Sequence, residues 1–385
     1  MLKRTPVGDL LEGMVLGRPI YKEDMSTLLS DGTALTSDHI DAIRAIGMPA
    51  VYVIVEDDVD TASVSDEAAK HPAGEANVAH TASIDYDAKA IPEKTQILDQ
   101  GFVKEYNDCL DKLEIVYEQA KSGLIDPVMA EQLASAVMRL SKGAKAVSHI
   151  HNLEVKGDYI LHHSLHVAIL AGLMGKWLRM SKRRQREFII AALFMDLGNI
   201  RLSPTLLNKS GRLTPEERKL MQRHVELGYE IVRASALGEN EDIANAVLQH
   251  HERNDGTGYP NGISKEQISE FARILALLDM YDAMGSNRVY ANKKSPFEVF
   301  DIMSNDITNG KLDTDFGFQF IRRVCHSLHG NWVQLSNGEK AKIVYMDESR
   351  LFSLPVVQTM EGEFIDLNRQ ADIKINHLLT STELG

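Results

Sequence analysis

The chain has 385 residues, of which 44% are hydrophobic and 25% are charged, so it is long enough for two or three globular units. Its formal net charge of −13 excludes binding to DNA or to an anionic membrane through overall charge, and an anionic ligand would need a locally positive site. The two cysteines, Cys109 and Cys325, are far apart and provide no disulfide framework, which fits a reducing compartment.

Hydropathy gives a second constraint. No apolar run approaches the roughly 20 residues of a membrane span, and the first residues lack the apolar segment of a signal peptide. We therefore expect a cytoplasmic protein that does not insert into a membrane.

Residues 1–55 predict a small α+β domain. Short apolar runs alternate with turn residues, and a helix is expected from Asp38 to Ile46, with Ser37 as its N-cap and Gly47 at its end. The run AVYVIV that follows is rich in β-branched residues and predicts a strand.

Residues 56–92 are acidic and rich in alanine and serine, which predicts a flexible linker. From 93 to 330 apolar residues recur at helical spacing, as they do at Phe102, Tyr106, Leu110, Leu113 and Tyr117. This pattern predicts a helical body. The apolar stripe of its first helix, expected from Ile97 to Gly123, fits either the core or a contact in a homodimer.

The period changes again in residues 331–385. Two short β-rich runs flank the turn dipeptide Asn337-Gly338, which predicts a hairpin, and the run LPVVQTM predicts a further strand. The expected fold class is therefore mainly α, with a small N-terminal α+β domain and a small C-terminal β appendage.

Histidines concentrate in the helical body, several of them beside acidic residues at helix ends. Neutral imidazoles and carboxylates are the usual ligands of iron, manganese or zinc. Two such ions a few ångströms apart can share a bridging carboxylate and bind a phosphodiester between them. The candidate ligands are His163, Asp196, His224, His250, His251 and Asp279.

The stretches HHERNDGTGYP and FARILALLDMYDAMGSNRVY resemble the signature of the HD-GYP family. These are bacterial phosphodiesterases of the HD superfamily that hydrolyse cyclic di-GMP. The resemblance spans about residues 158–292, and the region before the linker is similar to a small domain often found ahead of such modules. It implies a helical HD-type phosphohydrolase fold, two divalent metal ions, and pGpG or GMP as product.

Carried onto this chain, the resemblance assigns His163 and Asp279 to the first ion. It makes Asp196 the bridge between the ions and the catalytic carboxylate. The second ion would be held by three histidines, His224, His250 and His251. Iron or manganese are the expected ions.

Substrate contacts also follow from the resemblance. Tyr259, in the Gly-Tyr-Pro loop, would shape the mouth of the site. Arg288 would face a substrate phosphate, whose oxygens a guanidinium binds bidentately.

The chain departs from the family pattern at several positions. Met195 stands where the family has the histidine of its His-Asp pair, and a thioether is a weak ligand for iron or manganese. Asn199 replaces a lysine, and Ala291 stands where a basic side chain is common. Tyr159 occupies the position of an acid that trinuclear members have four residues before His163, so a third metal is not expected.

Two functions follow as alternatives. The leading one is hydrolysis of cyclic di-GMP by a metal-activated water, impaired because one positioned charge can contribute about 10² to 10³ in rate. The other is a degenerate module that binds cyclic di-GMP or a signalling protein without hydrolysing it. Hydrolysis of another phosphoester is a third alternative. His162 and His166 are interpreted as ordinary surface or outer-sphere groups.

Overall fold

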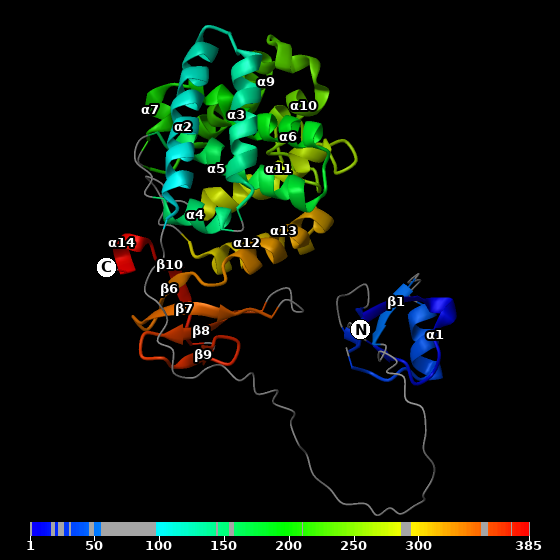
Figure 1. Cartoon of the computed structure of the whole chain (residues 1–385). Helices are drawn as coiled ribbons and strands as arrows, with labels where there is room; N and C mark the ends of the chain where they lie inside the picture. Colours follow the sequence, from blue (N-terminus) through cyan, green and yellow to red (C-terminus); the bar gives the residue numbers. More distant parts are fainter. Residues whose placement is uncertain are drawn as a thin grey trace, which may run out of the picture. The chain divides into compact units, whose positions relative to one another are not determined.

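The structure is a computed structural model. It describes residues 2–16, 20–21, 27–30, 32–45, 50–54, 98–143, 145–153, 158–209, 211–285, 294–347, 353–370 and 372–384. The chain divides into two compact units, Met1–Ser83 and Ile84–Gly385 (Figure 1). The linker expected at residues 56–92 lies outside the described residues.

The first unit is an α+β fold around a small core in which Leu16, Leu35 and Ile43 are fully buried. Its main sheet is antiparallel with the strand order β1-β5-β2. The elements are β1 (Leu2–Pro6), a 3-10 helix η1 (Val7–Asp9), β2 (Val15–Leu16), the paired strands β3 (Ile20–Tyr21) and β4 (Thr27–Leu29), α1 (Ser37–Ala45), and β5 (Ala50–Ile54).

The expected helix is present, but it starts one residue earlier than predicted. Ser37 is its first residue, and the Thr36 hydroxyl accepts a hydrogen bond from the backbone N–H of His39 at 3.3 Å. A hydroxyl that satisfies a donor of the first turn is what defines an N-cap. Thr36 therefore caps the helix, and the prediction of Ser37 as the cap was wrong. Gly47 lies outside the described residues.

The helical body belongs to the second unit (Figure 1). Its helices are α2 (Gln100–Lys121), α3 (Pro127–Leu140), α4 (Ala146–Asn152), α5 (Tyr159–Trp177), α6 (Lys182–Phe194), η2 (Leu197–Arg201), α7 (Pro204–Leu207), α8 (Pro215–Gln222), α9 (His224–Arg233), η3 (Ala236–Glu239), α10 (Glu241–Gln249), α11 (Glu270–Gly285), α12 (Pro296–Thr308) and α13 (Thr314–Ser327). None of the helices in the described part of the chain combines the length and apolar character that crossing a bilayer requires.

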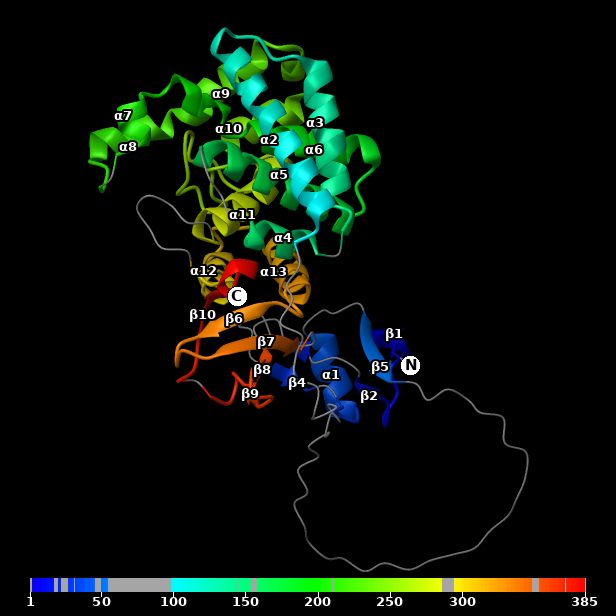
Figure 2. The same cartoon turned by 60° about the vertical axis from the view of Figure 1, so that its left-hand side comes forward.

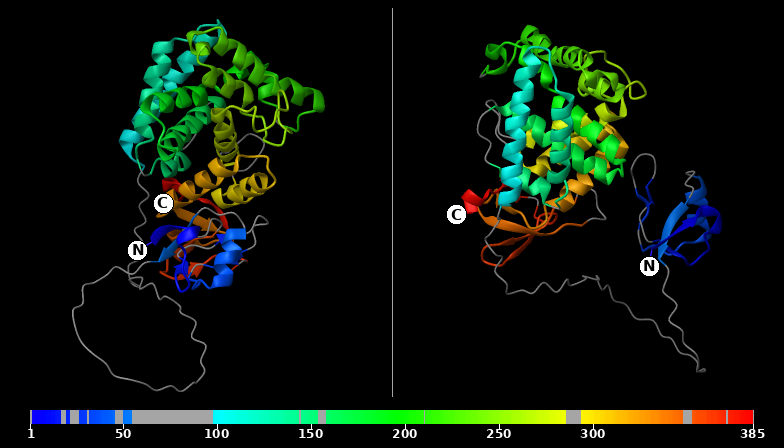
Figure 3. Two further views of the ribbon diagram at one scale, coloured as in Figure 1. Left: turned by 90° about the vertical axis from the view of Figure 1, so that its right-hand side faces the viewer. Right: turned by 45° about the horizontal axis from the view of Figure 1, so that its top comes forward.

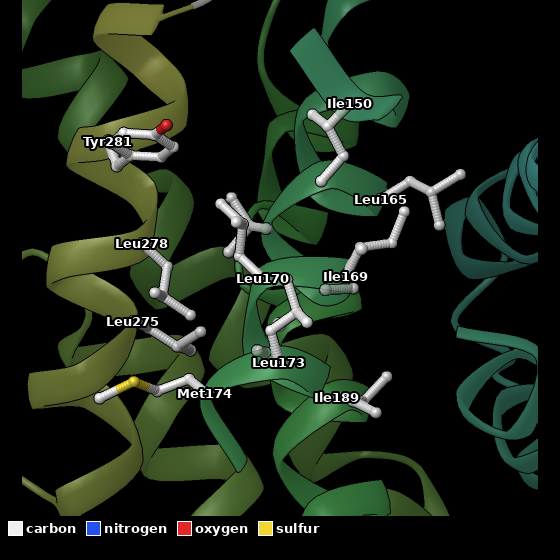
Figure 4. Close-up of a cluster of buried hydrophobic side chains, with 14 of the residues drawn as sticks. Ile150, Leu165, Ile169, Leu170, Leu173, Met174, Ile189, Leu275, Leu278 and Tyr281 are labelled. Atoms are coloured by element: carbon white, nitrogen blue, oxygen red, sulfur yellow. The ribbon is translucent and has the colours of Figure 1, made fainter. Parts of the chain in front are cut away.

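Helix α5 lies at the centre of the body. Every residue from Leu161 to Gly175 is buried, because neighbouring helices enclose α5 on all sides. It packs against α2, α3, α6 and α11. Figure 4 shows part of this core, where Leu170 and Met174 of α5 face Leu275 and Leu278 of α11.

Helix α2 covers α5 with the stripe seen in the sequence. Tyr106, Leu113 and Tyr117 are buried, whereas Leu110 is partly buried. The core interpretation of this stripe is therefore confirmed, and the dimer contact stays a prediction.

The C-terminal part forms a five-stranded antiparallel sheet with the order β10-β6-β7-β8-β9. Its elements are β6 (Trp332–Leu335), β7 (Lys340–Tyr345), β8 (Val356–Thr359), β9 (Phe364–Asp366), β10 (Ile375–Leu378) and the short helix α14 (Ser381–Leu384). The hairpin at Asn337-Gly338 is confirmed, with Gly338 at φ +91°. The sheet lies at the end of the body beside α12 and α13 (Figures 2 and 3).

One face of this sheet joins the same hydrophobic core as the helices, through Val333, Leu335, Ala341 and Ile343. A separate C-terminal domain from residue 331 thus stays a prediction. The predicted fold class is confirmed, because the chain is mainly α with a β appendage at its C-terminus.

Candidate metal centre

Four of the candidate ligands converge at the ends of three helices. Asp196 follows α6, His224 begins α9, and His250 and His251 follow α10. One donor atom from each lies within 4.8 Å of the donor atoms of the other three. Histidine and carboxylate donors at this separation suit a first-row divalent cation.

A close backbone contact brings two of these ligands together. A Cβ on Gly198 would overlap the carbonyl oxygen of His224 and would lie 2.5 Å from the backbone nitrogen of Gly228. Only glycine allows η2 and α9 to approach so closely. Because Gly198 is two residues from Asp196, this contact fixes the carboxylate next to the His224 imidazole.

Hydrogen bonds to the backbone fix the tautomers of two histidines. His224 Nδ1 lies 2.8 Å from the Met221 carbonyl oxygen, and His250 Nδ1 lies 2.9 Å from that of Val247. A carbonyl can only accept, so each Nδ1 carries a proton, and each ring turns its Nε2 inward. The two Nε2 atoms are 3.5 Å apart.

Asp196 completes this half of the site. Its Oδ1 lies 3.4 Å from His224 Nε2 and 4.0 Å from His250 Nε2. Burial lowers the pKa of His250 to about 4, so its imidazole is neutral at pH 7. The His250 Nε2 lone pair therefore faces His224 Nε2 and the Asp196 carboxylate, and this set of nitrogen and oxygen donors fits a metal ion.

The other half of the site faces the second oxygen of Asp196. His163 Nε2 lies 3.5 Å from Asp196 Oδ2 and 3.1 Å from Asp279 Oδ1. Asp279 Oδ2 in turn lies 3.6 Å from His251 Nδ1. The two oxygens of Asp196 thus point to different histidines, as a carboxylate between two ions would.

The charges in this half are strongly coupled. Burial opposes a charge on His163, but its hydrogen bonds to Asp279 and Asp282 outweigh burial and raise its pKa to about 10. Burial also opposes the charge on Asp279, yet the bond to His163 holds the pKa of that carboxyl well below its usual range. A metal ion would displace the proton on Nε2, because histidine binds metals as the neutral imidazole.

The Gly-Tyr-Pro loop folds back over the double histidine. The Tyr259 ring stacks on His251 with centroids 4.7 Å apart, and its backbone N–H donates to the His251 carbonyl at 3.2 Å. A Cβ on Gly258 would lie 2.5 Å from that same carbonyl oxygen. The loop therefore covers the imidazole of His251 on one side.

Two predicted positions lie outside the described residues, namely Arg288 and Ala291. Of the remaining departures, Met195 and Asn199 are buried and Tyr159 is half-buried. Met195 has no exposed surface and belongs to the hydrophobic core, and Asn199 donates its backbone N–H to the Asp196 carbonyl at 3.0 Å. Tyr159 stacks on His163 with centroids 5.4 Å apart.

A layer of groups lies behind His163, and the sequence interpretation included His162 and His166 in such a layer as one alternative but missed Asp282. His162 and His166 were interpreted as surface or outer-sphere groups, and both are buried because α5 has no solvent-facing side in this region, so the surface alternative was wrong. His166 bonds Asp282, which also bonds His163. The signal was the i,i+3 spacing of Asp279 and Asp282, which places both on one face of a helix.

Glu252 is a further missed residue. Although only 2% exposed, its carboxylate accepts the backbone N–H groups of Asn261 at 2.7 Å and Ile263 at 3.2 Å. It thereby anchors the loop that carries Tyr259 to the end of α10. An acid directly after a double histidine was visible in the sequence, but its partners were not.

The chain is similar to HD domain proteins and to cyclic di-GMP phosphodiesterases. The family model described as HD domain matches residues 127–316. A cyclic di-GMP phosphodiesterase of Pseudomonas aeruginosa is 31% identical over 214 residues, which cover 54% of this chain and 49% of that protein. The cyclic di-GMP phosphodiesterase response regulator RpfG of Xanthomonas campestris is 40% identical over 121 residues, or 31% of this chain and 32% of that protein.

A third relative acts on a related nucleotide. The 3'3'-cGAMP-specific phosphodiesterase 1 of Vibrio cholerae is 29% identical over 163 residues, which cover 42% of this chain and 37% of that protein. The chain thus spans about half the length, or less, of these curated relatives. Residues 127–316 thus match the HD domain family, and the HHERNDGTGYP stretch within them resembles the HD-GYP signature.

Proposed function

We propose that the chain is a metal-dependent phosphodiesterase that hydrolyses cyclic di-GMP to pGpG or GMP. The observation that carries this proposal is the convergence of Asp196, His224, His250 and His251 on one point, with two imidazoles turned inward by backbone carbonyls. Phosphodiester hydrolysis suits a site in which a carboxylate is shared between two sets of imidazole ligands. The names of the relatives supply the substrate class, a cyclic dinucleotide.

The metal ligands follow from the two halves of the site. Asp196 would bridge, His163 and Asp279 would hold the first ion, and His224, His250 and His251 would hold the second. Iron or manganese are the ions we propose. When bound, the ions supply Lewis acidity toward the phosphodiester and lower the pKa of a water molecule.

The chain's own residues would orient both reactants. Asp196 directs one oxygen to each half, so it would also orient the attacking water. The Tyr259 ring, which lies against His251, would give a guanine base or a phosphate one wall of the site mouth. Arg288 is proposed to bind a substrate phosphate through its planar guanidinium.

The second candidate function is binding of cyclic di-GMP without hydrolysis. Met195 favours it, because a fully buried thioether stands where the family has an imidazole. Affinity for the first ion would then fall while the site keeps its shape. The same purified protein tests both functions.

The experiment measures metal content, cyclic di-GMP binding and turnover of the full chain. His251→Ala should abolish turnover, whereas His326→Ala, at an exposed position on α13, should keep it. Turnover that needs metal and is lost only in His251→Ala supports the enzyme. A protein that is fully loaded, binds cyclic di-GMP and never cleaves it overturns the enzyme and supports the binding module. If the protein cleaves 3'3'-cGAMP and not cyclic di-GMP, then 3'3'-cGAMP takes the place of cyclic di-GMP as the proposed substrate.

A further inference from the structure

A buried carboxylate behind the metal centre binds two histidines of α5 at once. Asp282 Oδ2 lies 2.7 Å from His163 Nδ1, and Asp282 Oδ1 lies 3.0 Å from His166 Nδ1. Asp282 is 5% exposed, and both imidazoles are 3% exposed. A carboxylate in this position accepts from both rings, so each Nδ1 carries a proton.

The network continues to a different helix. The Tyr106 hydroxyl, on α2, lies 3.0 Å from His166 Nε2 and 2.7 Å from His162 Nδ1. It is 1% exposed. A bonded path therefore runs from α2 through His166 and Asp282 to the imidazole that faces Asp196 and Asp279.

With a neutral His166 ring, the hydrogen bonds allow one assignment of protons from Asp282 to His162. His166 Nδ1–H donates to Asp282, so His166 Nε2 must accept from the Tyr106 hydroxyl. The Tyr106 oxygen then accepts from His162 Nδ1–H. At the other end, His163 donates Nδ1–H to Asp282, so that the proton on Nε2 is the one that a metal ion would displace.

We propose that Asp282, His166 and Tyr106 are positioning residues for His163: they fix its ring orientation and its Nδ1–H tautomer, so that Nε2 is presented to the first metal ion. The inference rests on the proposed metal-dependent function and extends it to residues that touch neither metal nor substrate. Outer groups of this kind commonly set the orientation and basicity of a metal-bound imidazole.

The network matters more here than it would at a site with further imidazole ligands for the first ion. Because Met195 carries no imidazole, His163 is the one histidine that lies near both Asp279 and Asp196 in that half among the residues that the structure describes, with His251 across the site. A misplaced His163 ring would then remove the last nitrogen ligand of the first ion. We therefore expect changes far from the ions to affect one of the two ions selectively.

Two variants of the full chain test the network, each with a defined defect. Asp282→Asn keeps the shape but leaves one acceptor oxygen and sets an N–H₂ group against an imidazole N–H. Tyr106→Phe removes one hydroxyl and keeps the ring. The matched control is Tyr117→Phe, which also removes a buried hydroxyl from α2, where it bonds Ser164 Oγ and the Leu193 carbonyl at 3.0 Å each.

Two measurements read out the variants without relying on turnover. NMR of ¹⁵N-histidine-labelled, metal-free protein identifies the ring nitrogen of His163 that carries a slowly exchanging proton. Titration calorimetry with Mn²⁺ gives the affinity of each ion. Asp282→Asn should lose the protected Nδ1–H signal and weaken one Mn²⁺ site about 10-fold to 100-fold. Tyr106→Phe should weaken the same site about 2-fold to 10-fold, the range for one hydrogen bond.

Either of two outcomes would overturn the proposal. These are an Asp282→Asn protein with the wild-type His163 signal and wild-type Mn²⁺ affinity, or a Tyr117→Phe protein that weakens Mn²⁺ as much as Tyr106→Phe does. If Asp282→Asn does not fold, Tyr106→Phe against its control decides. A wild-type protein with the protected Nδ1–H but no turnover contradicts the proposed function alone, because the network is read in the metal-free state.

Discussion

Gly198 and His224 are in backbone contact, and a methyl group on Gly198 would overlap the His224 carbonyl oxygen. Gly198→Ala should therefore push η2 away from α9 and separate Asp196 from the His224 imidazole. We expect a loss of about 1–3 kcal/mol in the free energy of unfolding, as for other overpacked sites, together with a weaker Mn²⁺ site. Thermal unfolding and calorimetric titration measure the two effects.

Gly211→Ala is the matched control, because a Cβ there meets no atom within 4 Å. It should leave both quantities unchanged. If Gly198→Ala binds Mn²⁺ like the wild type, the contact does not set the position of Asp196.

Glu252 should be essential for the conformation of the Gly-Tyr-Pro loop. Glu252→Gln replaces one of two accepting oxygens by an N–H₂ group that faces a backbone N–H, so a buried donor loses its partner. The expected cost is about 1–3 kcal/mol of stability, with a raised KM for cyclic di-GMP. Glu266→Gln, at an exposed position of the same segment, should change stability by less than about 0.5 kcal/mol. Equal effects of the two variants would show that the carboxylate does not anchor the loop.

Met195→His tests whether the missing ligand can be restored. A fully buried imidazole without a partner should cost about 1–3 kcal/mol in metal-free protein. If the new imidazole reaches the first ion, Mn²⁺ should raise the melting temperature more than in the wild type, and turnover should increase. Met195→Leu keeps the apolar packing and should show the wild-type response. The idea fails if Mn²⁺ stabilises all three proteins equally.

Asp313 should contribute stability that depends on pH. It accepts the backbone N–H groups of Asp315 and Phe316 at the start of α13 and pairs with Arg273 at 2.5 Å. Asp313→Ala should cost about 1–3 kcal/mol, because both the cap and the ion pair are lost. Asp313→Asn keeps a good cap and should cost less.

The sign of the pH effect follows from the pKa of Asp313. Burial alone would raise it, but the Phe316 N–H and the Arg273 guanidinium together lower it. A depressed pKa stabilises the fold above the ordinary value of about 3.9, and this contribution is lost as the pH falls through the lower value in the folded protein. Denaturant unfolding should therefore show that the gap between wild type and Asp313→Asn closes below about pH 4. A gap that stays constant from pH 7 to pH 3 contradicts this expectation.

The ligand set could be predicted from the sequence because its members carry local signals. His250 and His251 are adjacent and precede a glycine-rich loop, and Asp196 sits in a recognisable motif. Asp282 and His166 carried a weaker signal, since their bond joins residues 116 apart and depends on how α5 packs against α11. Such a contact depends on the tertiary fold, so it could not be predicted from a single sequence.

The same limit applies at the C-terminus. The hairpin at Asn337-Gly338 was predictable because its turn chemistry is specific. Strand β9 has three residues and β10 has four, with a register shift at its pairing with β6, so neither gives a recognisable period. Their positions follow from the neighbours that they pair with.

The HD domain match begins at residue 127, yet α2 ends before it. A fragment cut at the bounds of the match would lose Tyr106 and Tyr117 and would expose to water the α5 surface that α2 now covers. The segment that matches the HD domain family is therefore shorter than the segment that packs into one helical body, because α2 belongs to the body and lies before the match.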